Sequence, residues 1–311
     1  MGDCSRLLLR PADNRSATVQ IRGLQSPHYS RTTAGGASFV PVSRLSKTLS
    51  ALARLARNPW LLNAVLAADT SAWQRRAGAH AARWGVGPQG LPVVPLRHFL
   101  PPNGTDTAAP FAFQDGGSLP TDLLLLRGLA RQRPGCRYFE IGTWRGESAA
   151  NVAAVAASVH TLNLSAAEMQ ALGLAEEYIG LHGFFSQALP NVTHLHGNSA
   201  TYDFAGLGPP FDLIFIDGDH HYEAVRRDTA RVFAHLVGPQ TVVVWHDASR
   251  QPGAPRWEVL AGLLDGLPAA APGYLYQVSH SLCAVYSPHP LPTTPPGAPP
   301  LAHRVTVALP Q

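Results

Sequence analysis

Between residues 121 and 246, short apolar segments alternate with longer segments of helical periodicity, and this order constrains the fold more than any other feature of the chain. The segments that we predict to be strands are 137–141, 159–164, 193–196, 211–217 and 241–246. Helical patterns cover residues 121–130, 147–157, 166–189 and 220–236. Strands that are apolar on both faces suit a parallel sheet covered by helices. The alternation therefore predicts an α/β fold, with a doubly wound, Rossmann-like and mostly parallel sheet that has helices on both faces.

The chain outside this region predicts three further parts. Residues 1–35 are polar and lack periodicity, which indicates a mobile N-terminal arm. Residues 36–119 read as a helical accessory segment, with a helix from 43 to about 73, followed by a linker rich in proline and glycine. Residues 120–287 form the main domain, closed by an antiparallel pair at 274–278 and 283–286, and 288–311 form a proline-rich tail.

The N-terminal part has a one-sided charge pattern. No acidic residue occurs between Asp13 and Asp69, while basic residues recur there. A transit peptide or a surface for an acidic partner would have this pattern. We favour an accessory segment in an arginine-rich protein, and because no secretory apolar core is present we expect the protein to be cytoplasmic.

Composition excludes several classes of protein. Hydrophobic residues make up 45% and charged residues 14%, which is too apolar for a disordered chain. The longest apolar stretches, such as 241–245, are too short to span a membrane. The three cysteines are scattered, so we expect neither a disulfide framework nor a CxxC metal site. A net charge of +4 does not by itself argue for nucleic acid, and we expect a chain that could form homo-oligomers.

A glycine-containing turn follows the first predicted strand of the main domain. Gly142 and Gly146 are four residues apart, which lets the backbone turn tightly and approach a ligand, with the N–H groups of the next helix facing it. The pattern is not GxGxxG, and an ordinary βα turn is the alternative interpretation. Glu140 beside the turn would repel a pyrophosphate but would suit a cationic ligand or a ribose hydroxyl.

Acids and histidines follow the next predicted strands. The residues are Asp217, Asp219, His220 and His221 after segment 211–217, and His246 and Asp247 after segment 241–246. Adjacent strand ends would bring Asp217, Asp219, His246 and Asp247 into one cluster. Carboxylate and imidazole ligands suit Mg²⁺, Mn²⁺ or a similar divalent cation. Helix capping by the two acids, with a structural His246–Asp247 pair, is the alternative.

These motifs resemble those of a known family. The sequences EIG-x3-G-x-S from Glu140, IDGDH-x-Y from Ile216, and HD at His246 are similar to class I S-adenosylmethionine-dependent methyltransferases. Within that class the resemblance is to the branch with catechol O-methyltransferase-like enzymes and bacterial macrolide-sugar O-methyltransferases. It covers about residues 120–287.

The resemblance implies S-adenosylmethionine as the cofactor and assigns residues to it. The implied cofactor-binding residues are Glu140, Gly142, Thr143, Gly146, Ser148, Asn163, Ser199 and Asp217. Asn163 departs from the family, which usually has an acid there for the ribose hydroxyls, and Ser199 stands where the adenine is contacted. The implied metal ligands are Asp217, His246 and Asp247, and Asp219 could exchange roles with Asp217.

The implied reaction needs a deprotonated acceptor. A divalent cation such as Mg²⁺ would lower the pKa of the acceptor hydroxyl, and a base would take its proton. His220 stands where catechol-type enzymes have a lysine base, and His221 is the second candidate. We therefore expect O-methylation of a small hydroxylated or sugar-bearing molecule. A non-catalytic cofactor-binding module is the alternative, and a nicotinamide oxidoreductase is disfavoured because GxGxxG is absent.

The segment 166–189 is long for a connection between two strands and is rich in apolar residues. It could pack over the site, or it could form a pair of helices that covers the core. We favour the helix pair.

Overall fold

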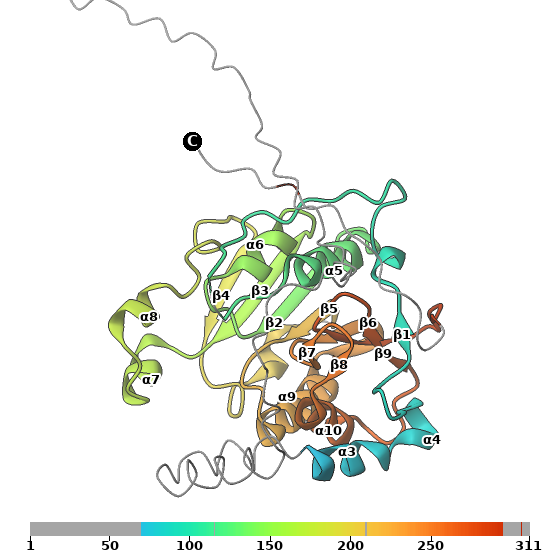
Figure 1. Cartoon of the computed structure of the whole chain (residues 1–311). Helices are drawn as coiled ribbons and strands as arrows, with labels where there is room; N and C mark the ends of the chain where they lie inside the picture. Colours follow the sequence, from blue (N-terminus) through green and yellow to red (C-terminus); the bar gives the residue numbers. More distant parts are fainter. Residues whose placement is uncertain (1–69, 115, 209, 295–305, 307–311) are drawn as a thin grey trace, which may run out of the picture. The chain divides into compact units, whose positions relative to one another are not determined.

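The computed structural model describes residues 70–114, 116–208, 210–294 and 306 (Figure 1). Residues 70–294 belong to one compact unit, Asn58–Pro296. The expected arm at 1–35, most of the helix expected at 43–73 and most of the proline-rich tail lie outside the described residues.

An eight-stranded sheet organises this unit. Its order is β1 (Val93–Val94), β9 (Tyr274–Val278), β10 (Ala284–Ser287), β6 (Val237–Trp245), β5 (Phe211–Ile216), β2 (Arg137–Ile141), β3 (Ser158–Asn163) and β4 (Val192–His196). Only β10 runs antiparallel to its neighbours, β6 and β9, and the other adjacent pairs are parallel. The predicted doubly wound, mostly parallel sheet is therefore confirmed, including its closing antiparallel pair. A second sheet pairs β7 (Ser249–Gln251) with β8 (Ala254–Pro255).

Helices cover both faces of the sheet (Figure 1). The α-helices are α3 (Ser71–Gly78), α4 (Ala81–Trp84), α5 (Pro120–Arg131), α6 (Glu147–Ala153), α7 (Ala166–Ala171), α8 (Glu176–Gly180), α9 (Tyr222–His235) and α10 (Trp257–Gly266). The 3₁₀ helices are η1 (Leu96–His98) and η2 (Phe204–Leu207).

Alternate residues of β5 enter two separate cores. Ile214 and Ile216 pack with residues of α9 and α10, whereas Leu213 and Phe215 pack with residues of α5 and α6. This is the two-residue period of a strand that is buried on both faces, and it explains why β5 reads as a continuous apolar run.

Several elements differ from the prediction at their ends, and the sheet contains a strand that was not predicted. Helix α5 begins at Pro120 with Leu119 as N-cap, one residue before the predicted helical pattern at 121–130. Proline fits the first helical position because its missing N–H would have no partner there. The sheet also takes β1 from the segment expected to be a linker, and Thr294 donates its backbone N–H to Val93.

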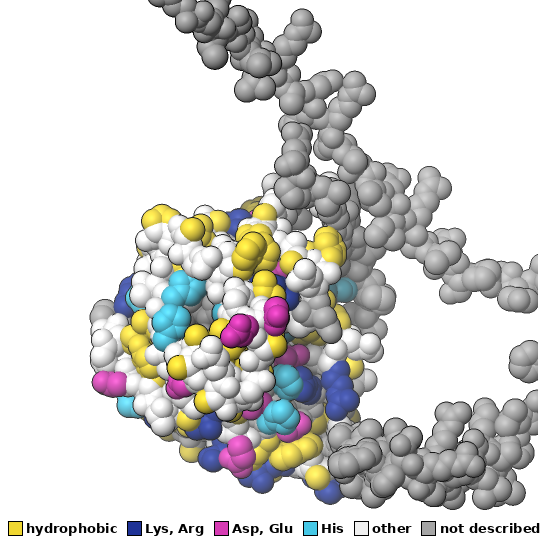
Figure 2. Space-filling view, turned by 90° about the vertical axis from the view of Figure 1, so that its left-hand side faces the viewer, with side chains coloured by type: hydrophobic (Ala, Val, Ile, Leu, Met, Phe, Trp, Pro, Cys, Tyr) yellow, Lys and Arg dark blue, Asp and Glu magenta, His cyan; other side chains and the backbone are white. Residues whose placement is uncertain are grey.

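The segment 166–189 differs more. It holds two short helices, α7 and α8, which lie beyond the β4 edge of the sheet (Figure 1). Leu172 is 68% exposed and Phe184 is 57% exposed. The expectation of a helix pair that covers the core is therefore wrong, because most of its apolar side chains face outward. On the face turned toward the viewer in Figure 2, apolar side chains reach the surface among polar ones.

None of the helices in the described part of the chain has the length and apolarity needed to cross a bilayer.

Candidate functional site

The chain changes its winding direction between β2 and β5. From β2 it proceeds to β3 and β4 on one side, and from β5 to β6 on the other. In open α/β sheets, ligands bind at such a switch point, outside the carboxyl ends of the strands. The residues that follow β2 and β5 are therefore the first place to look for a site.

Gly142 and Asp217 meet at this switch point. The Asp217 N–H donates to the Ile141 carbonyl at 2.8 Å, and the Gly142 N–H donates to the Leu162 carbonyl at 2.9 Å. Gly142 has φ +94°, and a β-carbon on it would overlap the Asp217 carbonyl. Only glycine allows the backbone after β2 to lie this close to the backbone after β5.

A tight turn then leads into α6. The Gly146 N–H donates to the Thr143 carbonyl at 2.8 Å, and Gly146 is the N-cap of α6 with φ +80°. Trp144 inside the turn also has a positive φ, of 42°. Thr143 and Ser148 are buried. The predicted glycine turn is therefore present, and it is held by internal hydrogen bonds.

Glu140 lies below this turn and is fully buried. Its carboxylate accepts hydrogen bonds from Tyr138 Oη at 2.7 Å and from Thr161 Oγ1 at 2.8 Å. The Thr161 hydroxyl also contacts that of Thr143, so the carboxylate is linked to the turn. Burial raises the pKa of Glu140 to about 7, although the bonds from these hydroxyls oppose the shift. The geometry gives Glu140 a supporting position rather than a place at the open surface.

The residues expected at the ribose and the adenine follow β3 and β4. Asn163 is partly buried, and its Nδ2 donates to the Leu164 carbonyl at 3.2 Å. The Ser199 hydroxyl donates to Asp228 of α9 at 2.9 Å. Since β2, β3 and β4 are neighbours in the sheet, these side chains follow consecutive strands at one edge.

Three of the four predicted metal ligands come together at the ends of β5 and β6. His246 Nδ1 lies 3.1 Å from Asp217 Oδ1 and 3.7 Å from Asp247 Oδ2. Donor atoms of the three residues all lie within 4.8 Å of one another. A small cleft reaches this cluster, and it is lined by Ile216–His220, Val225, Trp245–Asp247 and Val259.

The charges in this cluster act on one another. Burial alone would lower the pKa of His246, but the carboxylates of Asp217 and Asp122 beside it raise its pKa well above the ordinary value. Burial raises the pKa of Asp217. Burial also acts to raise the pKa of Asp247, but the neighbouring His246 holds it below its ordinary value. A cation between the two carboxylates would meet negative charge at the cleft.

Asp219 lies outside this cluster. Its side chain is 59% exposed, and its Oδ1 accepts from the His221 N–H at 2.9 Å and lies 2.5 Å from His221 Nδ1. His221 is therefore held by Asp219 at the surface. His220 points the other way, with its Nδ1 3.8 Å from Asp247 Oδ2. The structure thus brings His220, and not His221, to the cluster.

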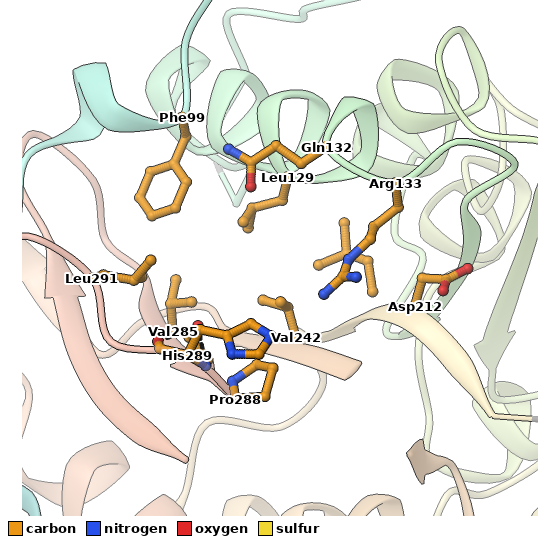
Figure 3. Close-up of a pocket in the computed structure, with 12 residues that line it drawn as sticks. Phe99, Leu129, Gln132, Arg133, Asp212, Val242, Val285, Pro288, His289 and Leu291 are labelled. Atoms are coloured by element: carbon orange, nitrogen blue, oxygen red, sulfur yellow. Dashed lines mark hydrogen bonds between the residues drawn. The ribbon is translucent and has the colours of Figure 1, made fainter. Parts of the chain in front are cut away.

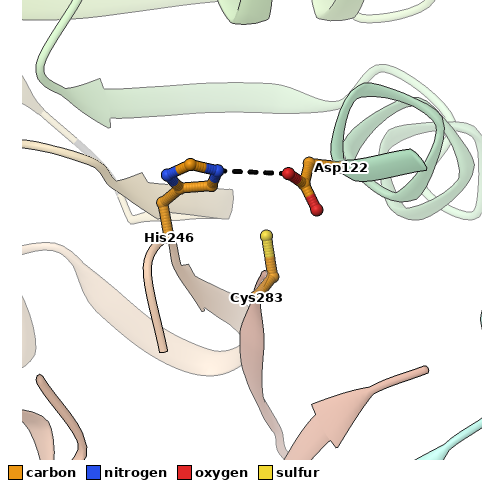
Figure 4. Close-up of side chains that lie close together, drawn as sticks. All are labelled: Asp122, His246 and Cys283. Carbon is orange, nitrogen blue, oxygen red and sulfur yellow. Dashed lines mark hydrogen bonds and ion pairs between the residues drawn. The ribbon is translucent and has the colours of Figure 1, made fainter. Parts of the chain in front are cut away.

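Sequence reasoning missed Asp122, which is fully buried in the first turn of α5. Its Oδ2 lies 3.1 Å from His246 Nε2 (Figure 4). Asp122 lies within the predicted helical pattern at 121–130, and nothing in that local pattern indicates a partner 124 residues further along the chain.

A second missed feature joins α8 to the glycine turn. Trp144 stacks on Tyr178, with ring centroids 4.1 Å apart and planes at 30°. Two backbone N–H groups also bind the turn: Gly183 donates to the Trp144 carbonyl at 2.7 Å, and Phe185 donates to the Arg145 carbonyl at 2.9 Å. The exposed segment 166–189 is therefore anchored on the candidate cofactor site.

A cavity of about 250 Å³ lies elsewhere, near the amino ends of the parallel strands (Figure 3). It is lined by Phe99, Leu129, Gln132, Arg133, Asp212, Leu213, Val242, Val285, Ser287, Pro288, His289 and Leu291. None of the predicted site residues is among them, so this cavity is separate from the candidate site.

Comparison with known proteins gives one family match. Residues 139–248 match a family model described as a methyltransferase domain, and this range contains every predicted site residue. None of the curated proteins matches the chain significantly.

Solved structures are similar over part of the chain. A methyltransferase from Podospora anserina, bound to SAH, is 20% identical, with 57% of this chain and 82% of that chain covered and a TM-score of 0.41. An O-methyltransferase from Bacillus cereus in complex with SAH is 19% identical, with coverage of 56% and 84% and a TM-score of 0.39. An O-methyltransferase from Streptomyces achromogenes involved in tomaymycin synthesis, in complex with SAM, is 22% identical, with coverage of 56% and 82% and a TM-score of 0.38.

Proposed function

We propose that the chain transfers a methyl group from S-adenosylmethionine to a hydroxyl of a small hydroxylated or sugar-bearing molecule, and the match of residues 139–248 to a methyltransferase domain supports this proposal. One observation carries this proposal. The backbone of Asp217 packs against Gly142 of the predicted cofactor turn, and its side chain pairs with His246 in the acid–imidazole cluster. Asp217 thus connects the proposed cofactor site to the proposed acceptor site.

The charge of the site supports a sulfonium cofactor over a dinucleotide. Glu140 lies below the glycine turn and Asp217 lies beside it. A pyrophosphate at this turn would face two carboxyl groups, whereas the positive sulfonium of S-adenosylmethionine would be attracted by Asp217. This argues against the nicotinamide oxidoreductase.

The cluster also fits a divalent cation. Two carboxylates and one imidazole nitrogen are within ligand distance of one another, and the second imidazole nitrogen is bonded to a buried carboxylate, as is usual for metal-binding histidines. Asp217, His246 and Asp247 would hold Mg²⁺ or Mn²⁺ there. When bound, the cation would lower the pKa of an acceptor hydroxyl.

In this proposal His220 takes the proton of that hydroxyl. Its ring is half exposed at the cleft, and its Nδ1 lies near Asp247, so an acceptor bound at the cluster would lie within its reach. When bound, S-adenosylmethionine would supply the methyl group: an O–CH₃ bond to the acceptor would form as the S–CH₃ bond breaks, and the electron pair of that bond would return to sulfur.

Calorimetry would test the proposal on the full chain. We expect wild type to bind S-adenosylmethionine with micromolar affinity and to bind Mn²⁺. Asp217→Asn should weaken the binding of both S-adenosylmethionine and Mn²⁺, because it removes the negative charge beside the glycine turn and one of the proposed metal ligands. Asp219→Asn is the matched control, since Asp219 is an exposed acid two residues away and outside the cluster, and it should match wild type.

Two other results would contradict the proposal. A folded wild-type sample that does not bind S-adenosylmethionine would refute the methyltransferase function. Binding of the cofactor without methyl transfer to any of a panel of catechols, phenols and sugars would favour the non-catalytic cofactor-binding module.

A further inference from the structure

Asp122 makes three hydrogen bonds with its buried carboxylate. Oδ2 accepts from the Leu119 N–H at 2.8 Å and lies 3.1 Å from His246 Nε2, and Oδ1 accepts from the Leu282 N–H at 2.9 Å. Asp122 is fully buried, and His246 is only 8% exposed. Three chain segments far apart in sequence therefore meet at one carboxylate.

The position of Asp122 determines which ring nitrogen of His246 keeps its proton when a cation binds at the cleft. A carboxylate can only accept, so the nitrogen that faces it, Nε2, must donate. The opposite nitrogen, Nδ1, faces the carboxylates of Asp217 and Asp247 at the cleft, so it also donates. A cation bound at the cleft would replace the proton of Nδ1, whereas Asp122 keeps the proton on Nε2. Figure 4 shows the imidazole with one nitrogen directed at Asp122 and the other directed away.

Cys283 does not change this arrangement. Its thiol lies close enough to Asp122 and His246 for the three to be considered as metal ligands. Burial raises the pKa of Cys283 well above its ordinary value, which keeps the thiol neutral. The oxygens of Asp122 are already engaged by three donors, so we assign no cation to this side of the ring.

We propose that Asp122 is a positioning residue, which holds His246 so that Nδ1 becomes a nitrogen ligand of the cation site, and that the site therefore prefers Mn²⁺ to Mg²⁺. The inference rests on the proposed function, because it assumes that the cluster of Asp217, His246 and Asp247 binds a cation. Beyond the proposed function, it names the residue that orients His246 and the metal that the site prefers.

The preference follows from ligand chemistry. Mg²⁺ favours oxygen ligands and keeps its waters, whereas imidazole nitrogen suits the transition metals better. In many metal sites a carboxylate accepts a hydrogen bond from the histidine nitrogen that does not bind the metal. Replacing that carboxylate typically weakens metal binding by about 10–100-fold. A ring with neither nitrogen fixed would lose part of this contribution, because it could rotate or carry its proton on Nδ1.

The first test compares cation binding in three proteins. Mn²⁺ is titrated into wild type, Asp122→Asn and Asp212→Asn and is followed by electron paramagnetic resonance, with Mg²⁺ as competitor. We expect wild type to bind Mn²⁺ more tightly than Mg²⁺, and Asp122→Asn to bind Mn²⁺ about 10–100-fold more weakly. Asp212→Asn is the matched control, because Asp212 also accepts a backbone N–H, from Arg137 at 2.8 Å, but at the start of β5, away from the cluster.

Calorimetry on the same samples separates this inference from the proposed function. S-adenosylmethionine should bind all three proteins equally, since in the described part of the chain the side chain of Asp122 bonds to Leu119, His246 and Leu282, none of which belongs to the glycine turn. Loss of cofactor binding in wild type would refute the methyltransferase function itself. Equal Mn²⁺ affinity in wild type and Asp122→Asn, or tighter binding of Mg²⁺, would overturn the inference.

A second measurement needs no variant of Asp122, in case Asp122→Asn does not fold. Wild type labelled with ¹⁵N-histidine should show a protonated Nε2 for His246, assigned by its absence in His246→Gln, before and after addition of Zn²⁺. Zn²⁺ should shift the Nδ1 resonance. Loss of the Nε2 proton on addition of Zn²⁺ would overturn the inference.

Discussion

No β-carbon can be placed on Gly142 without overlapping the carbonyl oxygen of Asp217. The close approach of these two residues joins the turn after β2 to the turn after β5. We predict that Gly142→Ala destabilises the fold by about 3 kcal/mol, because overpacking adds to the cost of a positive φ for alanine. It should also abolish S-adenosylmethionine binding, as measured by calorimetry alongside urea unfolding.

Gly135→Ala is the control for backbone conformation. Gly135 has φ +73°, similar to Gly142, but a β-carbon there would meet no atom within 4 Å. We expect it to cost only about 1 kcal/mol and to leave cofactor binding unchanged. Equal destabilisation by the two substitutions would show that the contact with Asp217 is unimportant.

Glu140 should make the stability of the fold depend on pH. Its pKa is about 7 in the folded protein, against an ordinary value of 4.5. Between these values the folded protein keeps a proton that the unfolded chain has lost, so the free energy of unfolding falls as the pH rises. Each unit of pKa corresponds to about 1.4 kcal/mol, which gives a loss of about 3 kcal/mol by pH 8.

Glu140→Gln removes this titration, since an amide stays neutral. The unfolding free energy of the variant minus that of wild type should therefore rise by about 3 kcal/mol between pH 4.5 and pH 8. Urea unfolding of both proteins across this range measures the difference. If this difference does not change with pH, Glu140 has its ordinary carboxyl pKa in the folded protein.

The sheet could be predicted from the sequence because its central strands are buried on both faces. β5 is apolar from Leu213 to Ile216, and β2 is buried from Tyr138 to Ile141 although it includes Glu140, so their local pattern and their packing largely agree. β1 could not be predicted, because two valines form a strand only through pairing with β9. Helix α10 was missed, although apolar residues recur in it at helical spacing.

The candidate site was predictable only where it follows strands. Asp217, His246 and Asp247 stand directly after β5 and β6, and parallel strand ends meet at one edge. The direction of Asp219 could not be predicted, because it depends on a local bond to His221. Asp122 could not be predicted either, since only the packing of α5 against the sheet brings it to His246.

His220 and His221 should differ strongly in their effect on methyl transfer. Only His220 faces the cluster, whereas His221 is bonded to Asp219 at the surface. We predict that His220→Ala lowers kcat by about 10²–10⁴-fold without changing S-adenosylmethionine affinity, and that His221→Ala behaves like wild type. Added imidazole should restore part of the activity of His220→Ala. Equal rates in both variants would exclude His220 as the base.

Tyr178 should affect cofactor binding more than stability. Its ring is 40% exposed and stacks on Trp144, which lies in the glycine turn with a positive φ. Loss of the Trp144–Tyr178 stack removes about 0.5–1.5 kcal/mol of stabilisation. We expect this loss to make the glycine turn less ordered and to leave the two hydrophobic cores unchanged. Tyr178→Ala should therefore leave urea unfolding nearly unchanged while weakening S-adenosylmethionine binding several-fold, and hydrogen exchange should rise at residues 183–186.

Two controls test whether the stack is responsible. Tyr178→Phe keeps the ring and should match wild type in cofactor affinity. Phe184→Ala removes an exposed ring from the same segment and leaves the stack in place, so it should also match wild type. If all three variants bind the cofactor equally, the turn is ordered by its own hydrogen bonds, and segment 166–189 does not contribute to the cofactor site.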